Sequence, residues 1–183
     1  LLLVVAATRT LESAIMSPTP HRIPWTIDGL SLAPGHRVLE IGCGTGVSSA
    51  LICERLVTGH YHAIDRSEKM IAAARARNDA SIRKGLATFD VADAASAQYP
   101  DVHFDRILAI NVNLFWRQAD DALERLRRWL APDGQLHLAF EPPHAVQLAG
   151  IADACAQRLS RHGFRNLVPE RKQGCWRVQA FPG

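Results

Sequence analysis

A glycine-rich loop is the segment whose residue types and spacing most directly suggest chemistry. It reads Gly-Cys-Gly-Thr-Gly, and its candidate ligand-binding residues are Gly42, Cys43, Gly44 and Gly46. Closely spaced glycines let the backbone take positive φ angles and let a ligand approach its N–H groups. N–H groups at the start of a helix attract negative charge. A loop of this kind between a strand and a helix therefore predicts a nucleotide-like ligand.

The glycine spacing discriminates between classes of nucleotide. The dinucleotide fingerprint G-x-G-x-x-G would place its third glycine at position 47, where this chain has Val47, and Glu40 stands just before the loop. The loop also lacks the Lys-Ser/Thr ending of a phosphate-binding P-loop. These departures disfavour NAD and nucleoside triphosphates. They favour a phosphate-free cofactor whose carboxylate meets the start of the helix.

Two aspartates follow later strand-like runs. Asp65 comes directly after residues 60–64, and a carboxylate there can accept hydrogen bonds from both hydroxyls of a ribose. A simple capping role at the strand end is the alternative for this residue. Asp93 follows residues 87–89 and can accept a hydrogen bond from the exocyclic amine of adenine, with Asp90 as a competitor for that role.

The elements that must position these side chains alternate along the chain. Short runs rich in Val, Ile, Leu and Phe predict buried strands over Arg37–Ile41, 60–64, 87–89, Phe104–Ile110 and 135–140. Segments of helical period predict helices over residues 47–56, 67–78, 118–130 and 146–161. This alternation predicts parallel strands joined by right-handed crossovers, and hence a doubly wound α/β sheet. Such sheets bind ligands at the carboxyl ends of their strands.

The C-terminal segment departs from the alternation. Residues 164–169 and 175–181 are strand-like and are joined by a charged turn at 170–174, which predicts a terminal hairpin. This hairpin would place an antiparallel strand at or near one edge of the sheet.

The N-terminal segment also differs from the rest of the chain. We expect a short helix over residues 8–16, followed by an irregular arm, because prolines interrupt helices. The prolines in question are Pro18, Pro20 and Pro24. The predicted organisation is therefore an N-terminal helix and arm over residues 1–30, and a single ligand-binding domain over residues 31–183.

Composition limits the partners and the compartment. The 183 residues are 48% hydrophobic, which suffices for one ordinary core, and the 21 Lys and Arg residues are spread along a chain of net charge +3. This spread disfavours nucleic acid as a partner. The four cysteines show no CxxC spacing, which predicts no metal site and a reducing, cytoplasmic location. The apolar run at residues 1–7 is too short to span a membrane. The oligomeric state is not set by these features.

Over residues 34–181 the sequence resembles the class I S-adenosylmethionine-dependent methyltransferases. Residues 38–46 are similar to the glycine-rich motif of the family, and residues 63–65 to its ribose-binding position. Residues 91–94 resemble the adenine loop, although Ala92 replaces a frequent glycine. The resemblance implies a Rossmann-like sheet of seven strands in the order 3-2-1-4-5-7-6, with strand 7 antiparallel. This expectation agrees with the predicted terminal hairpin.

The same resemblance implies the cofactor and its contacts. The cofactor would be S-adenosylmethionine, with S-adenosylhomocysteine as the product. The cofactor-binding residues implied are Glu40, Gly42, Cys43, Gly44, Gly46, Asp65, Arg66, Met70, Asp93, Ala94 and Asn111.

The reaction implied is direct displacement at the methyl group, with the acceptor held near the ends of the fourth and fifth strands. Asn111 follows the fourth strand without the Asn/Asp-Pro-Pro-Tyr motif of enzymes that methylate planar nitrogens. Phe115 and Trp116 could wall an apolar pocket, with packing in the core as the equal alternative. After the fifth strand, His144 is the first candidate for a general base and Glu141 the second.

The acceptor itself is left open by the sequence. We expect a small organic molecule, with a protein or RNA acceptor at an open site, or a catalytically silent cofactor-binding subunit, as alternatives. Residues 141–163 provide one helix between the fifth and sixth strands and no room for an inserted lid. Any cover over the site would therefore come from residues 1–30 or from a second subunit.

Overall fold

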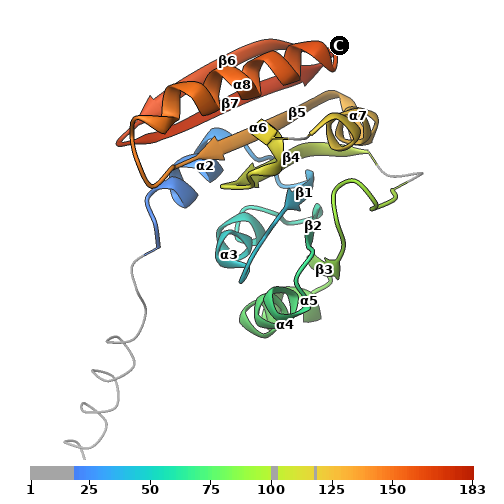
Figure 1. Cartoon of the computed structure of the whole chain (residues 1–183). Helices are drawn as coiled ribbons and strands as arrows, with labels where there is room; N and C mark the ends of the chain where they lie inside the picture. The colour runs from blue at the N-terminus through green and yellow to red at the C-terminus, as the bar shows by residue number, and fades with distance from the viewer. Residues whose placement is uncertain (1–18, 100–102, 118) are drawn as a thin grey trace, which may run out of the picture.

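The computed structural model of the chain describes residues 19–99, 103–117 and 119–183. Seven strands form one sheet in the order β3-β2-β1-β4-β5-β7-β6 (Figure 1). Strands β1 to β5 pair in parallel, and β7 runs antiparallel to both β5 and β6. The predicted Rossmann-like fold and strand order are therefore confirmed. The strands are β1 (Arg37–Ile41), β2 (His60–Asp65), β3 (Ala87–Val91), β4 (Phe104–Ile110), β5 (Leu130–Phe140), β6 (Phe164–Lys172) and β7 (Cys175–Pro182).

Helices cover both faces of the sheet. Val38 and Leu39 are adjacent on β1 but pack into different hydrophobic clusters, because successive side chains of a strand point to opposite faces. Helices α2 to α5 cover the face of Val38, and α6 to α8 cover the face of Leu39 (Figure 1). The helices are α2 (Arg22–Gly29), α3 (Val47–Cys53), α4 (Glu68–Arg77), α5 (Asp79–Arg83), α6 (Leu114–Arg117), α7 (Asp120–Trp129) and α8 (Gln147–Arg161). In the part of the chain that the structure describes, none of them is long and apolar enough to cross a membrane.

Several element boundaries differ from the predictions. Strand β5 begins at Leu130 rather than at residue 135, because Leu130 pairs with Phe104 across an irregularity in the register. Helix α3 ends at Cys53, three residues earlier than predicted. The short helices α5 and α6 were not predicted. The terminal hairpin is tighter than expected, since only Gln173 and Gly174 separate its strands. Both have positive φ, which suits a two-residue hairpin loop.

The prediction of an irregular arm is wrong for α2. Pro24 lies in the first turn of this helix, where backbone N–H groups have no partner within the helix, so the ring removes no hydrogen bond. Trp25, Ile27 and Leu30 are buried. The helix expected over residues 8–16 lies outside the described residues.

Two arginines of the sheet bind the backbone of α2 or the residue that follows it. The Nε of Arg106 donates to the carbonyl of Leu30 at 2.6 Å. Arg177 donates to the carbonyl of Trp25, and its guanidinium carbon lies 4.6 Å from the centre of that indole ring. Helix α2 is therefore fixed to strands β4 and β7 by polar contacts as well as by burial.

Candidate functional site

The glycine loop between β1 and α3 has the backbone that its sequence predicts. Gly42, Gly44 and Gly46 all have positive φ, at 72°, 54° and 70°. A Cβ added at Gly42 would lie 2.6 Å from a methyl of Val112, and one added at Gly46 would lie 2.5 Å from the amide nitrogen of Asn78. A Cβ added at Gly44 would have no neighbour within 4 Å. Packing therefore requires two of the glycines, and open space lies beside the third.

Asp65, at the end of β2, holds the loop in place. One of its carboxylate oxygens accepts from the backbone N–H of Gly44 at 3.0 Å, and the other accepts from the N–H of Ser67 at 2.9 Å. Each oxygen of a carboxylate has a second acceptor position. The side chain that anchors the glycine loop can thus also accept hydrogen bonds from a diol.

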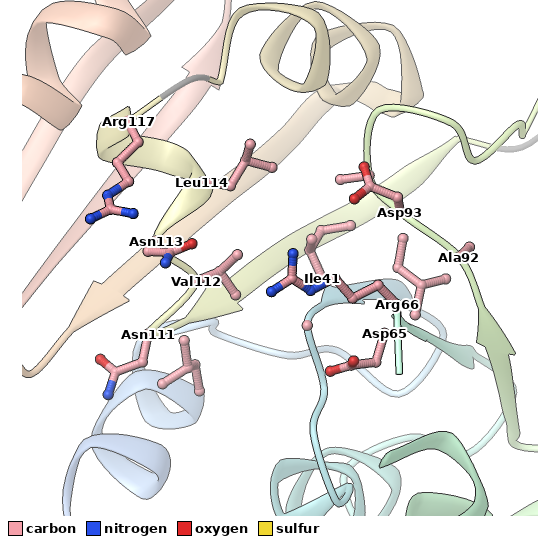
Figure 2. A pocket seen from close by; sticks show the side chains of 14 residues that line it. Ile41, Asp65, Arg66, Ala92, Asp93, Asn111, Val112, Asn113, Leu114 and Arg117 are labelled. Atoms are coloured by element: carbon pink, nitrogen blue, oxygen red, sulfur yellow. The ribbon is translucent and has the colours of Figure 1, made fainter. Parts of the chain in front are cut away.

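A cavity of about 450 Å³ opens at the carboxyl ends of β1, β2 and β4 (Figure 2). This volume is within the range of pockets that bind cofactors and small ligands. We call it the first cavity. Its lining includes six of the predicted cofactor-binding residues, namely Gly42, Asp65, Arg66, Asp93, Ala94 and Asn111.

The other predicted cofactor contacts lie outside the lining of the first cavity. Glu40 is buried beneath the loop, where the hydroxyls of Ser48 and Tyr61 donate to its carboxylate. Burial raises the pKa of Glu40. Its contacts join β1 to α3 and β2, so they support the loop from behind. Burial likewise raises the pKa of the Cys43 thiol.

Of the remaining predicted contacts, Gly44 and Gly46 belong to the loop without lining the cavity. Met70 lies in the first turn of α4, where its backbone N–H donates to the hydroxyl of Ser67. Ser67 is thus the N-cap of α4.

A second cavity of about 530 Å³ lies beside the first, at the carboxyl ends of β4 and β5. The two cavities share Asn111, Asn113 and Arg117 in their lining, and the set of these three residues is called the shared wall below. The rest of the second cavity is mostly apolar or aromatic. Its other lining residues are Trp116, Phe140, Glu141, Pro142, Pro143, Gln147 and Ile151.

Asn111 connects β4 and β5, the two strands at whose carboxyl ends the second cavity lies. Its side-chain oxygen accepts from the N–H of Glu141 at 2.7 Å, and its backbone N–H donates to the carbonyl of Ala139 at 2.8 Å. The residue has a φ of +58°, a conformation that Asn tolerates better than most residues. It therefore fixes the end of β4 against the end of β5, in addition to lining both cavities.

The two candidate bases lie in different surroundings. Glu141 lines the second cavity and forms an ion pair with Arg22, whose Nη1 is 2.6 Å from a carboxylate oxygen. His144 is exposed and is not among the lining residues of either cavity. As far as the described residues go, the shared wall contains no carboxylate and no imidazole.

Sequence reasoning missed several residues of this site. Arg117 was not singled out, and Arg22 was placed in an irregular arm, yet Arg117 lines both cavities and Arg22 binds Glu141. For Arg117 a signal was available, because it follows shortly after the carboxyl end of a predicted strand. Arg22 is 119 positions from its partner, and no local pattern connects the two.

Metal chemistry has no support in the site. Across the described ranges, no group of three or more His, Cys, Asp or Glu side chains could hold a metal ion. All four cysteines are buried and free.

Comparison with known proteins identifies the family. Residues 38–134 match the family model described as "Methyltransferase domain". Methyltransferase GfsG of Streptomyces halstedii is 32% identical over 111 residues, which are 60% of this chain and 39% of that protein. Trans-aconitate 2-methyltransferase of Acidovorax sp. (strain JS42) is 32% identical over 154 residues, covering 74% of this chain and 56% of that protein. The chain thus spans about two fifths to about half of these relatives.

A solved methyltransferase structure shares the fold. The structure of magnesium protoporphyrin IX methyltransferase from Synechocystis PCC 6803 with bound S-adenosylmethionine has a TM-score of 0.64 and 20% identity, and the match covers 98% of this chain and 81% of that chain. The fold and the glycine-loop site define a Rossmann-like nucleotide-binding domain. The chain belongs to the class I S-adenosylmethionine-dependent methyltransferases. S-adenosylmethionine is accordingly its cofactor.

Proposed function

We propose that this chain transfers a methyl group from S-adenosylmethionine in the first cavity to a small organic acceptor in the second. The observation that carries the proposal is the shared wall of Asn111, Asn113 and Arg117, because it brings two separate binding spaces together at the ends of β4 and β5. A transfer reaction needs its two reactants held side by side in fixed orientation.

In this proposal the first cavity binds the cofactor through groups suited to its parts. Asp65 accepts hydrogen bonds from the ribose hydroxyls, and Asp93 accepts from the adenine amine. The open space beside Gly44 allows close approach to the loop backbone. When bound, S-adenosylmethionine supplies a methyl group on a positively charged sulfur, which takes back the carbon–sulfur electron pair as an acceptor atom bonds to the methyl carbon.

The contribution of the protein is then mainly orientation and exclusion of water. The pair formed by Asn111 and the backbone of Glu141 keeps the ends of β4 and β5 together, which fixes the shared wall. If the acceptor must lose a proton, Glu141 is better located than His144 to take it, because Glu141 lines the second cavity. The carboxylate of Glu141 is also bound by Arg22 at 2.6 Å.

A small acceptor is favoured over a macromolecule by the size of the second cavity and by the relatives. The trans-aconitate 2-methyltransferase carries a small molecule in its name. So does the ubiquinone/menaquinone biosynthesis C-methyltransferase UbiE of Cupriavidus necator. A cytoplasmic location remains the accompanying prediction from the cysteine pattern.

The test combines cofactor binding with a block of the second cavity. Calorimetry with S-adenosylhomocysteine should give binding well below the millimolar range, and its absence would refute the proposal at the cofactor step. Gln147→Trp, at the exposed start of α8, should obstruct the second cavity, leave S-adenosylhomocysteine binding unchanged and strongly reduce methyl transfer to small acceptors. Gln157→Trp, exposed on the same helix and outside the cavity lining, is the matched control.

The same variants separate the alternatives. Transfer to protein or RNA that survives Gln147→Trp would show that the acceptor uses an open face instead of the second cavity. Cofactor binding without transfer to any small molecule, peptide or RNA in a radiolabelled methyl assay would identify a catalytically silent subunit.

A further inference from the structure

The positive charge of Arg117 in the second cavity is not paired with the carboxylate of the same cavity. Its ionisable lining residues are Arg117 and Glu141. Glu141 is already neutralised by Arg22 at 2.6 Å. Asp120, the acidic residue nearest to Arg117 along the chain, instead binds Arg158 and His162, at 3.2 and 2.8 Å. Among the described residues, the guanidinium of Arg117 therefore has no carboxylate within ion-pair distance, and the cavity carries a net positive charge.

Arg117 is positioned by the chain to serve a ligand in this space. It ends α6, the short helix that follows β4, and its backbone carbonyl accepts from the guanidinium of Arg158 on α8. In Figure 2 its side chain extends from α6 toward Asn113, within the shared wall. A guanidinium can offer two parallel N–H donors to a carboxylate or a phosphate, which makes it a specific anchor for an anion.

The rest of the second cavity suits a flat, apolar body. Trp116 meets Phe140 edge to face, with 4.6 Å between ring centres. Phe140 is itself buried and stacks in turn on Trp176, with 5.5 Å between ring centres, so it supports the Trp116 ring from behind. Pro142 and Pro143 complete this apolar wall, while Asn113 and Gln147 offer amide groups. Flat rings and prolines pack well against a planar or unsaturated ligand.

We infer that the acceptor is a small organic anion with a flat apolar body, whose charged group is bound by Arg117 and whose body packs against Trp116 and the two prolines. This inference deepens the proposed function and rests on it for the identity of the second cavity as the acceptor site. The inference names a chemical class and not one compound, because Arg117 could bind the negatively charged oxygens of either a carboxylate or a phosphate ester.

The test measures binding of matched probes to the full chain saturated with S-adenosylhomocysteine. Benzoate and trans-cinnamate are compared with benzamide and cinnamamide, and phenyl phosphate with phenol, by calorimetry or ligand-observed NMR. At least one anion should bind about tenfold more tightly than its neutral partner, as expected for one charge-assisted contact. The phosphate arm shows which type of anion is preferred. If no anion is preferred, whether both partners bind or neither does, the inference is overturned.

Two variants assign the preference to Arg117. Arg117→Gln should remove the difference between anion and neutral partner while S-adenosylhomocysteine still binds. Arg128→Gln is the control, because Arg128 is exposed on α7 and binds only Glu124 among the described residues. A preference that survives Arg117→Gln contradicts the inference, and so does loss of S-adenosylhomocysteine binding in this variant. Failure of the wild-type chain to bind S-adenosylhomocysteine would instead refute the proposed function, so the two failures are distinguishable.

Discussion

Replacing Asp65 by alanine tests the central assignment of the site. The variant removes a carboxylate that lines the first cavity and that also accepts from the N–H groups of Gly44 and Ser67. Two effects should follow. The cofactor should lose its partner for the two ribose hydroxyls, and the glycine loop should lose its anchor on β2.

The size of the binding effect follows from the two hydrogen bonds that the ribose hydroxyls would no longer donate. A hydrogen bond to a charged group contributes roughly 1.5–3 kcal/mol when it is buried. Asp65 is half-buried, so water compensates part of the loss of these two bonds. We expect a net loss of about 2–3 kcal/mol, which is roughly 30- to 150-fold in the dissociation constant of S-adenosylhomocysteine. Freeing the two backbone N–H groups should also lower the free energy of unfolding by about 1–2 kcal/mol.

Calorimetric titration with S-adenosylhomocysteine measures the first effect and urea denaturation the second. Asp90→Ala is the matched control, because Asp90 is an exposed carboxylate on neighbouring β3 whose ion pair with Arg75 spans 3.7 Å. It should change neither quantity by much. Unchanged cofactor affinity in Asp65→Ala, with the fold intact, would refute the ribose assignment. A comparable loss in Asp90→Ala would show that net charge, and not the position of one carboxylate, governs binding.

Three further predictions concern the scaffold of the site. Gly42→Ala should lower the free energy of unfolding by about 1–3 kcal/mol more than Gly174→Ala. Both glycines have positive φ, but only at Gly42 would the added methyl collide with Val112. Equal effects in urea denaturation would contradict the role of that contact. Asn111→Gly should destabilise the chain by about 1–2 kcal/mol, because the side-chain hydrogen bond with the N–H of Glu141 is lost. Asn166 has a similar positive φ but no side-chain partner in the described residues, so Asn166→Gly should be neutral or stabilising. Burial, with Arg106 and Arg177 nearby, lowers the pKa of His137 to about 3. As the pH falls, His137 is therefore protonated in the unfolded chain before it is protonated in the folded chain. The free energy of unfolding should fall between about pH 6.5 and pH 3, by up to about 1.4 kcal/mol per pH unit. His137→Gln should flatten this dependence in denaturation measured against pH, and His144→Gln, at an exposed position, should not.

The cofactor side of the site could be predicted from sequence because it is built from local rules. A strand, a loop with three glycines at positive φ and a helix occupy one continuous segment, and Asp65 ends the next strand. Each of these features can be recognised from residues that are close together in the sequence. The sequence did not indicate which of these residues face the cofactor cavity and which support the loop from behind. Glu40, expected as a cofactor contact, lies in a buried network with Ser48 and Tyr61. Its direction is set by the packing of α3 and β2 around it.

Two errors in the predicted fold have different physical origins. Proline was treated as a helix breaker at position 24, although its missing N–H is harmless in a first turn. The segment from Leu130 to Gly134 has turn composition, yet pairing with β4 at Phe104 extends β5 through it. The first error misapplied a local rule, whereas in the second a tertiary contact with a neighbouring strand outweighed the local preference of the residues.

The acceptor side resists prediction because three segments far apart in the chain build it. Arg22 comes from α2, Arg117 from the turn of helix after β4, and Glu141 from the end of β5. The sheet order, which sets β4 beside β5, and the contacts of α2 with β4 and β7 bring these charges together. Arg22 neutralises Glu141, and this leaves Arg117 to set the charge of the cavity. Substitution of Arg22 should therefore change the acceptor preference, because the charge of Glu141 would no longer be neutralised. It should not change the affinity for the cofactor, because Arg22 lies outside the lining of the first cavity.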